Sequence, residues 1–302
     1  MLLRTLSTPP RYNTSKPPKT LTLVTAFYVL PMSKFSKETY TAWLSNLLQL
    51  VWYNPYVYLV IYTDAQSSIW LPNIIPQLLA IQKVSICVRP MEHFYMYKYA
   101  DFWRKNHDAN TLLRRTTCWE LNMLWNEKLW FLRDVIQSPP PEFERTPYYA
   151  WCDAGYFRNR SGVDLDTTGG FNYSRWASPS RMAELDSNKI YYSLVNSDIS
   201  YVRHIKNLVQ HESILPPDQV TIGGGFCLIR GDDKEKISDW CVHYENVLIN
   251  MIEAGRLVKD DQIILANCIF SLLAEKDAVF YLVKESVGTP YDPWFVFQRF
   301  LL

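Results

Sequence analysis

Short apolar runs alternate along this chain with stretches whose apolar positions recur every three or four residues. Residues 21–28, 56–63 and 84–88 are apolar and rich in β-branched side chains, which predicts buried strands. Residues 38–52 have helical spacing, and residues 72–81 predict a short helix. A strand–helix–strand–helix–strand order indicates parallel strands with helices on both faces of the sheet.

The remainder of the chain continues this alternation with longer helices. Thr117 and Glu120 have the spacing of a capping box, which predicts a helix that starts near Cys118, and Gly255 is the expected stop of another helix. The polar segment 156–189 predicts a long loop with short helices. The further predicted strands are residues 148–152, 190–195, 221–230 and 279–283, and the further helices lie within 92–136, at 237–252 and from Asp260 or Asp261 to about residue 273. The whole pattern predicts an α/β fold with a mixed, mostly parallel sheet.

The charge of the chain is nearly balanced. Its 302 residues carry 31 Lys and Arg against 30 Asp and Glu, so that the formal net charge is +1. A protein whose main partner is nucleic acid usually has a basic excess, and we therefore expect no nucleic-acid partner. Residues 1–19 are basic and proline-rich and contain no acidic residue, which predicts a disordered tail before a single domain at 20–302.

The sequence contains no apolar run of the roughly 18 residues that a membrane-spanning helix requires. We therefore expect no transmembrane segment. The six cysteines are scattered and form no C-x-x-C pair, which favours reduced thiols over disulfides or a zinc site. Together these features predict a cytoplasmic protein.

A lone acid, Asp153, follows the predicted strand at residues 148–152. The carboxyl ends of strands in an open α/β sheet form the edge where ligands bind, and a carboxylate there can hold a divalent ion against a diphosphate. Ala154 and Gly155 come next and would let a ligand approach the backbone closely. The alternative is that Asp153 only caps a turn.

Three consecutive glycines, Gly223, Gly224 and Gly225, begin the predicted strand at 221–230. Glycine weakens strands, so this run indicates either a β-bulge or the close passage of a sugar or another chain. Asp260, Asp261 and Gln262 follow at a helix start. One acid is enough to cap a helix, and the second is then free to face a ligand.

Asp164 and Asp166 form a literal D-x-D sequence, but no clear strand precedes them. We interpret them as part of a loop that only resembles the motif. The sequence also lacks a P-loop, a G-x-S-x-G segment and a dinucleotide-binding G-x-G-x-x-G fingerprint.

These segments, taken in order, resemble the bacterial HtrL/YibB family, which is similar to GT-A glycosyltransferases. The resemblance covers roughly residues 20–285. It rests on residues 23–28, 62–64, 124–128, 151–158 and 223–226 and on Asp260-Asp-Gln262. The glycine strand and the Asp-Asp-Gln helix also look like the acceptor side of plant galactomannan and xyloglucan sugar transferases. The resemblance implies a GT-A-like, Rossmann-like sheet, with a nucleotide-sugar-binding half at 20–160 and an acceptor-binding half at 161–302.

The same resemblance implies roles for individual residues. Asp153 matches the last acid of a D-x-D motif that binds Mn²⁺ or Mg²⁺, but Trp151 stands where the first acid would be. Asp261 and Gln262 would contact the transferred sugar as catalytic residues, and Gly223–Gly225 would line the acceptor side. The implied nucleotide-sugar site consists of Thr25, Phe27, Tyr28, Asp64, Lys128, Trp151, Asp153, Ala154 and Gly155.

The activity that the resemblance implies is transfer of a sugar from a UDP-linked donor to a hydroxyl of a glycan or glycoprotein. The Asp-Gln pair at 261–262 favours retention of configuration. Two alternatives stay open. One is a sugar nucleotidyltransferase, whose usual glycine-rich basic signature is missing from residues 21–37. The other is a non-catalytic carbohydrate-binding protein on a decayed transferase fold.

Aromatic residues make up 15% of the chain. They serve either core packing or stacking on a base or sugar. Trp43, Trp125, Trp240 and Tyr244 fall on helix faces that we expect to be buried. The rings expected beside the donor site are Tyr28, Trp151, Tyr156 and Phe157.

Overall fold

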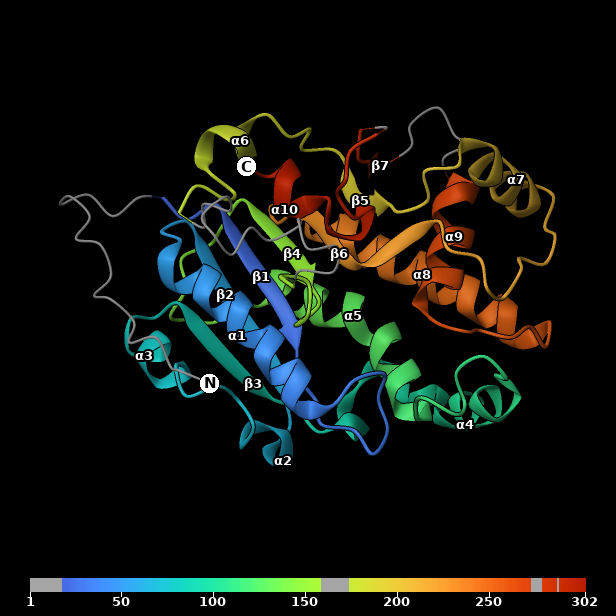
Figure 1. Cartoon of the computed structure of the whole chain (residues 1–302), viewed down its shortest axis with the longest axis horizontal. Helices are drawn as coiled ribbons and strands as arrows, with labels where there is room; N and C mark the ends of the chain where they lie inside the picture. Colours follow the sequence, from blue (N-terminus) through green and yellow to red (C-terminus); the bar gives the residue numbers. More distant parts are fainter. Residues whose placement is uncertain (1–17, 159–173, 273–278, 287) are drawn as a thin grey trace.

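A seven-stranded sheet crosses the molecule (Figure 1). The computed structural model describes residues 18–158, 174–272, 279–286 and 288–302. The strand order is β3-β2-β1-β4-β6-β5-β7, and the strands are β1 Leu21–Ala26, β2 Val57–Thr63, β3 Val84–Val88, β4 Tyr148–Cys152, β5 Ile190–Leu194, β6 Ile222–Arg230 and β7 Phe280–Val283. All neighbouring pairs of described strands are parallel except for the two that β6 makes with β4 and β5. The predicted α/β fold with a mixed, mostly parallel sheet is confirmed.

The central strands are apolar on both faces. In β2, the side chains of Val57, Leu59 and Ile61 enter one hydrophobic cluster, while those of Tyr58 and Val60 enter the other. Successive side chains of a strand point to opposite faces, so an uninterrupted apolar run predicts a strand with helices on both sides. This is why the central strands are recognisable from the sequence.

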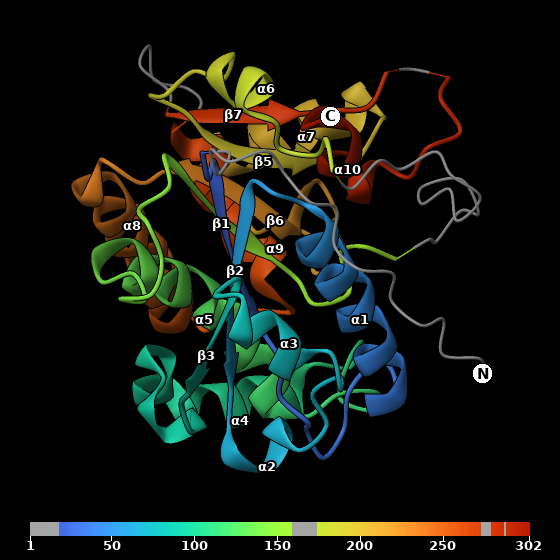
Figure 2. The same ribbon diagram turned by 90° about the vertical axis from the view of Figure 1, so that its left-hand side faces the viewer.

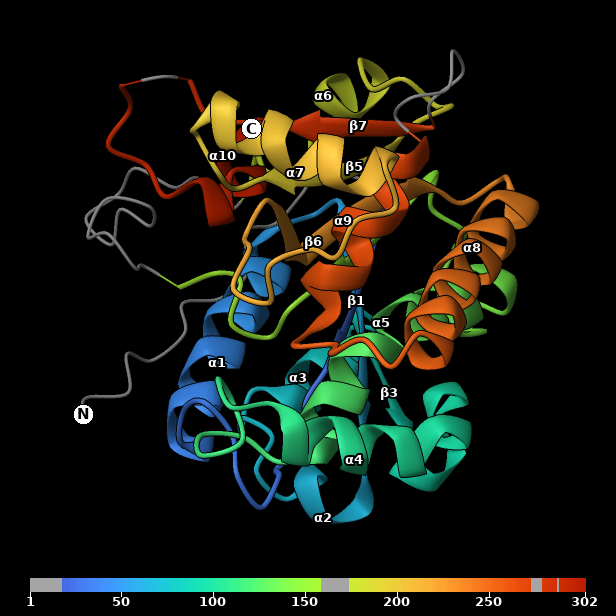
Figure 3. The same ribbon diagram turned by 90° about the vertical axis from the view of Figure 1, so that its right-hand side faces the viewer.

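Helices cover both faces of the sheet, as predicted. Figures 2 and 3 show α1 (Lys37–Tyr53) on one side of the strands and α5 (Trp119–Gln137) and α8 (Lys234–Glu253) on the other. Next to α8 lies α9 (Asp261–Leu272), and α7 (Ile199–Gln210) packs against α9. The remaining described helices are α2 Ala65–Ser68, α3 Ile75–Ala80, α4 Ala100–Ala109, α6 Pro179–Ala183 and α10 Phe297–Phe300, with 3-10 turns η1 Met91–His93, η2 Tyr95–Tyr99 and η3 Pro293–Phe295. Every helix in the described ranges is too short or too polar to cross a bilayer.

Two local predictions differ from the structure. The helix α5 does begin at Trp119, but its N-cap is Cys118 and no side chain caps it, so the capping box predicted for Thr117 and Glu120 is wrong. Thr117 instead donates its hydroxyl to the carbonyl of Leu113 at 3.0 Å. The helix α7 was not predicted, although Asp198 caps it in the expected way. The stop at Gly255 is confirmed, since this residue has a φ of 63° directly after α8.

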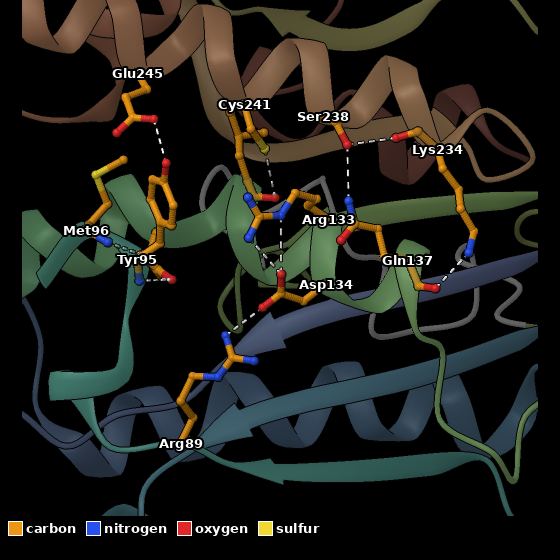
Figure 4. A network of polar contacts seen from close by, with 12 residues as sticks. Arg89, Tyr95, Met96, Arg133, Asp134, Gln137, Lys234, Ser238, Cys241 and Glu245 are labelled. Atoms are coloured by element: carbon orange, nitrogen blue, oxygen red, sulfur yellow. Dashed lines mark hydrogen bonds and ion pairs between the residues drawn. The ribbon is translucent and has the colours of Figure 1, made fainter. Parts of the chain in front are cut away.

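Polar contacts attach α8 to α5 and to the segment after β3 (Figure 4). The Gln137 amide donates to the Ser238 hydroxyl at 3.1 Å, and the Lys234 ammonium donates to the Gln137 carbonyl at 2.8 Å. At the other end of the interface the Tyr95 hydroxyl donates to the Glu245 carboxylate at 2.7 Å. These contacts hold α5 in place, and α5 carries a residue of the site described below.

Glu127 of α5 is a buried carboxylate that supports the 3-10 turn η2. Its two oxygens accept the backbone N–H groups of Tyr95 and Met96, each at 2.9 Å. Burial raises the pKa of Glu127 to about 8, although these two hydrogen bonds act to lower it. In the unfolded chain the same group titrates near its ordinary pKa of 4.5.

We expect Glu127 to make stability fall as the pH rises. Between about pH 5 and 8 the folded state keeps a proton that the unfolded state has released, so the contribution is complete at the acid end and is lost toward pH 8. The slope is at most about 1.4 kcal/mol per pH unit. Urea unfolding across this range, with Glu127→Gln for comparison, measures it. Equal slopes for the two proteins would contradict the assignment.

Candidate functional site

The chain reverses its direction across the sheet between β1 and β4. From β1 it proceeds outward to β2 and β3, and it then returns to place β4 on the other side of β1. In open α/β sheets the crevice at such a point, at the carboxyl ends of the strands, is the usual ligand site. A cleft of about 710 Å³ lies there. It is bounded by the segments after β1 and β4, by the start of β6, by α1, α5 and α9, and by η3.

Three charged residues from distant segments meet in this cleft. The Lys128 ammonium of α5 lies 2.9 Å from Asp261 Oδ2, at the start of α9, and 3.1 Å from Asp153 Oδ1, just after β4. The side chains of Lys128 and Asp261 are 11% and 7% exposed, whereas that of Asp153 is 41% exposed and faces the open cleft. The sequence analysis predicted a role for each of the three residues separately. The structure brings them together as one lysine–aspartate cluster.

The charges of the cluster stabilise one another. Burial acts to lower the pKa of Lys128, but the carboxylates of Asp153 and Asp261 outweigh burial and raise it. Lys128 therefore stays protonated. An ammonium has three donors, and here the acceptors are the two carboxylates and the Gly224 carbonyl, which lies at 3.0 Å. A phosphate oxygen could bind Lys128 only by displacing one of them.

Trp151 orients the exposed carboxylate. Its indole Nε1–H donates to Asp153 Oδ1 at 2.7 Å, and the backbone N–H of Asp153 donates to the Gly225 carbonyl at 2.9 Å. Thus Trp151, the residue that the family resemblance aligns with the first acid of a D-x-D motif, holds Asp153 by a hydrogen bond.

The glycines of β6 make room for the acids. A Cβ atom on Gly224 would lie 2.3 Å from Asp261 Oδ2, and one on Gly223 would lie 2.3 Å from the Ser193 hydroxyl. A Cβ on Gly225 would lie 3.4 Å from Asp153 Oδ2, which is an ordinary contact. Gly224 and Gly225 line the cleft, whereas Gly223 packs against β5. The glycine run therefore gives space first to side chains of the protein itself.

Aromatic rings form much of the cleft wall. The prediction that Trp43 and Trp125 are buried is wrong, because both are half-buried and line the cleft; Trp240 and Tyr244 are buried as predicted. Phe157 was expected beside the site but is fully buried, with its ring against Trp176. The rings that line the cleft are Phe27, Tyr28, Phe35, Tyr40, Trp43, Trp125, Trp151, Tyr156, Trp294 and Phe295.

Arg158 and Gly155 build one side of this wall. The Arg158 guanidinium stacks 4.3 Å from the centre of the Trp43 ring. A Cβ on Gly155 would lie 2.6 Å from Arg158 and 2.7 Å from the Trp43 ring. Only glycine leaves space for this pair, which explains why it occupies position 155.

Other predicted site residues have different positions. Ala154 and Gln262 line the cleft, and a side-chain oxygen of Gln262 is buried without a partner. Thr25 is fully buried in β1, outside the cleft lining. Asp64 is also outside the lining, and its carboxylate caps α2 by accepting the Ser67 N–H at 2.6 Å. Asp164 and Asp166 lie outside the described residues.

Two further residues line the cleft: Lys34, which the sequence interpretation did not single out, and Asp260, which it considered with Asp261 as a helix cap or a ligand-facing acid. Lys34 follows β1, and its ammonium lies 4.4 Å from the centre of the Trp125 ring. Asp260 is buried, pairs with Lys259 at 3.3 Å and has one carboxylate oxygen without a hydrogen-bond partner. Their positions beside a strand end and a helix start were the only available signals.

The two carboxylate oxygens that contact Lys128 do not fit a site for Mn²⁺ or Mg²⁺. Asp153 Oδ1 already accepts from Trp151 and Lys128, and Asp261 Oδ2 accepts from Lys128. In the part of the chain that the structure describes, no three His, Cys, Asp or Glu side chains are close enough to hold a metal ion. A divalent cation would have to compete with the ammonium for these oxygens.

The sequence matches no protein-family model and no curated protein. Among solved structures, the chain is similar to mouse xyloside xylosyltransferase 1 in its apo form, with 12% sequence identity and a TM-score of 0.39. The match covers 88% of this chain and 85% of that one. At this TM-score the likeness supports no statement about function. Any functional proposal therefore rests on the geometry of the cleft.

Proposed function

We propose that this protein is a GT-A-like glycosyltransferase, which moves a sugar from a UDP-linked donor to a hydroxyl of a glycan or glycoprotein. The observation that carries the proposal is the meeting of Lys128, Asp153 and Asp261 in a cleft at the reversal point of the sheet. The resemblance of these segments to the HtrL/YibB family supports it as well.

The contents of the cleft suit a nucleotide-sugar. Its volume of about 710 Å³ lies in the range of pockets that bury a ligand of this size. The aromatic rings of its wall can pack against a base or a pyranose, while carboxylate oxygens such as those of Asp153 can accept hydrogen bonds from sugar hydroxyls.

The reaction breaks the bond between the anomeric carbon and the phosphate oxygen. The electron pair leaves with UDP, positive charge develops on the sugar ring, and the acceptor hydroxyl forms the new bond and loses its proton. Asp153 and Asp261, which pair with Lys128, place negative charge beside the sugar where this positive charge develops. Gln262 lines the same cleft as a polar neutral group.

The rival function is a non-catalytic carbohydrate-binding protein. The wall of aromatic rings favours it, because such rings bind sugars without any chemistry. The two functions differ in their response to UDP. A binding module of this kind should bind glycans and ignore the nucleotide.

We expect UDP to stabilise the protein, and Asp153→Ala to abolish turnover of a UDP-sugar while the fold persists. A ligand at 100 times its Kd adds about 2.7 kcal/mol, which a thermal melt detects as a rise of several degrees in Tm. A screen of UDP- and GDP-sugars for donor hydrolysis identifies the donor. The matched control is Asp101→Ala, since Asp101 is an exposed acid on α4.

Two results would contradict the proposal. One is an unchanged Tm with UDP together with a clear rise with oligosaccharides, which would establish the rival. The other is unaltered donor hydrolysis in Asp153→Ala, which would place the site elsewhere.

A further inference from the structure

The diphosphate of a UDP-sugar needs positive charge, and the cationic groups of the cleft differ in what they can offer. The three donors of Lys128 are already engaged by Asp153, Asp261 and the Gly224 carbonyl. The cluster of one ammonium and two carboxylates has a net negative charge, which would repel a phosphate. Besides Lys128, the lysine and arginine side chains that line the cleft in the described part of the chain are Lys34 and Arg158. The Arg158 guanidinium is already stacked on the Trp43 ring, so Lys34 is the stronger candidate for the diphosphate.

Lys34 is the lysine in the right place. It lies on the segment between β1 and α1, at the point where the chain direction reverses, and it is exposed to the cleft. Its ammonium lies 4.4 Å from the centre of the Trp125 ring, which fixes the end of an otherwise flexible side chain. Partial burial among neighbouring protein atoms removes water from the ammonium and lowers the pKa of Lys34, while the negative charges of Asp260 and Asp261 act to raise it.

Lys34 also lies where two hollows join. Besides the cleft, it lines an adjoining hollow of about 420 Å³ that is formed by residues between Phe27 and Tyr40. A ligand with its sugar above the lysine–aspartate cluster and its nucleoside in the adjoining hollow would have its central diphosphate beside Lys34. A lysine is well suited to this position, because its ammonium acts as a point charge that several phosphate oxygens can approach.

We propose that Lys34 binds the diphosphate of the donor, and that the cleft meets the charge requirement of the donor with this ammonium and without a divalent cation. This inference rests on the proposed function, which it deepens. Lys128 then has a different role and holds Asp153 and Asp261 in position.

The test is isothermal titration calorimetry of the full chain with UDP and, separately, with uridine. We expect Lys34→Met to weaken UDP binding by about 10- to 100-fold, the loss of one charge-assisted hydrogen bond, and to leave uridine binding unchanged. Lys34→Arg should restore most of the affinity for UDP. Lys105→Met, at an exposed lysine of α4, is the matched control and should bind like the wild type. Chelation with EDTA should change none of these values.

Each opposite result overturns the inference in a recognisable way. If the wild type binds UDP and Lys34→Met binds it equally well, Lys34 is not the diphosphate group and the proposed function stands. If UDP binds only when Mn²⁺ or Mg²⁺ is added, a metal ion supplies the charge and the inference is wrong. If the wild type binds neither UDP nor uridine, the proposed function fails and this inference fails with it.

Discussion

Replacement of Lys128 by methionine is expected to destabilise the protein by about 3–5 kcal/mol. Methionine is close to lysine in length, so the main change is the loss of the ammonium. Asp261, whose side chain is 7% exposed, would be left as a buried carboxylate without its cation. Urea unfolding monitored by tryptophan fluorescence measures the difference in the free energy of unfolding.

The double variant Lys128→Met with Asp261→Asn separates charge from shape. It removes the buried ammonium together with the carboxylate that would be left alone, and we expect it to recover a large part of the lost stability. The single variant Asp261→Asn should cost less than Lys128→Met, because Lys128 keeps Asp153 and the Gly224 carbonyl as acceptors. A loss below about 1 kcal/mol in Lys128→Met, the value of an exposed ion pair, would show that the cluster is solvated.

Gly224→Ala is expected to disrupt the same lysine–aspartate cluster by a steric clash, without any change of charge. The added methyl group would lie 2.3 Å from Asp261 Oδ2, so the carboxylate must move away from Lys128 or the strand must shift. Overpacking of this kind costs about 1–3 kcal/mol. We expect loss of turnover as well, because the position of Asp261 would no longer be maintained. Thermal melts and a donor-hydrolysis assay give the two measurements.

The neighbouring glycine is the matched control. A methyl group on Gly225 would approach Asp153 Oδ2 no closer than 3.4 Å, so Gly225→Ala should fold with nearly the stability of the wild type. The two positions share one strand, and their difference isolates the contact with Asp261. Equal stability of Gly224→Ala and Gly225→Ala would mean that the cluster tolerates the displacement.

The sheet could be predicted because its strands are unusually apolar. The runs at β1 and β2 are buried on both faces, so they stand out from the amphipathic helices around them. The helix α7 was missed for the opposite reason. It lies at the surface, and of its residues only Ile205 and Val209 are buried, so its apolar side is short.

The site was predictable in its parts but not in its assembly. Asp153 and Asp261 were identified from their positions after a strand and at a helix start, and Lys128 from the family resemblance. No local rule states that Lys128 and Asp261, which are 133 residues apart, share a hydrogen bond. The importance of Lys34 depends on that same contact, because it follows only once the donors of Lys128 are known to be engaged.

The reversed strand β6 has a consequence for any attempt to divide this protein. On one side it pairs with β4, which belongs to the predicted nucleotide-sugar half, and on the other with β5 of the acceptor half. A cut near residue 160 would leave both fragments with a long unpaired strand edge, of the kind that promotes aggregation. We therefore expect the two halves to fold only as one chain. A chimaera that combines halves from two relatives would need matching side chains along the β4–β6 pairing.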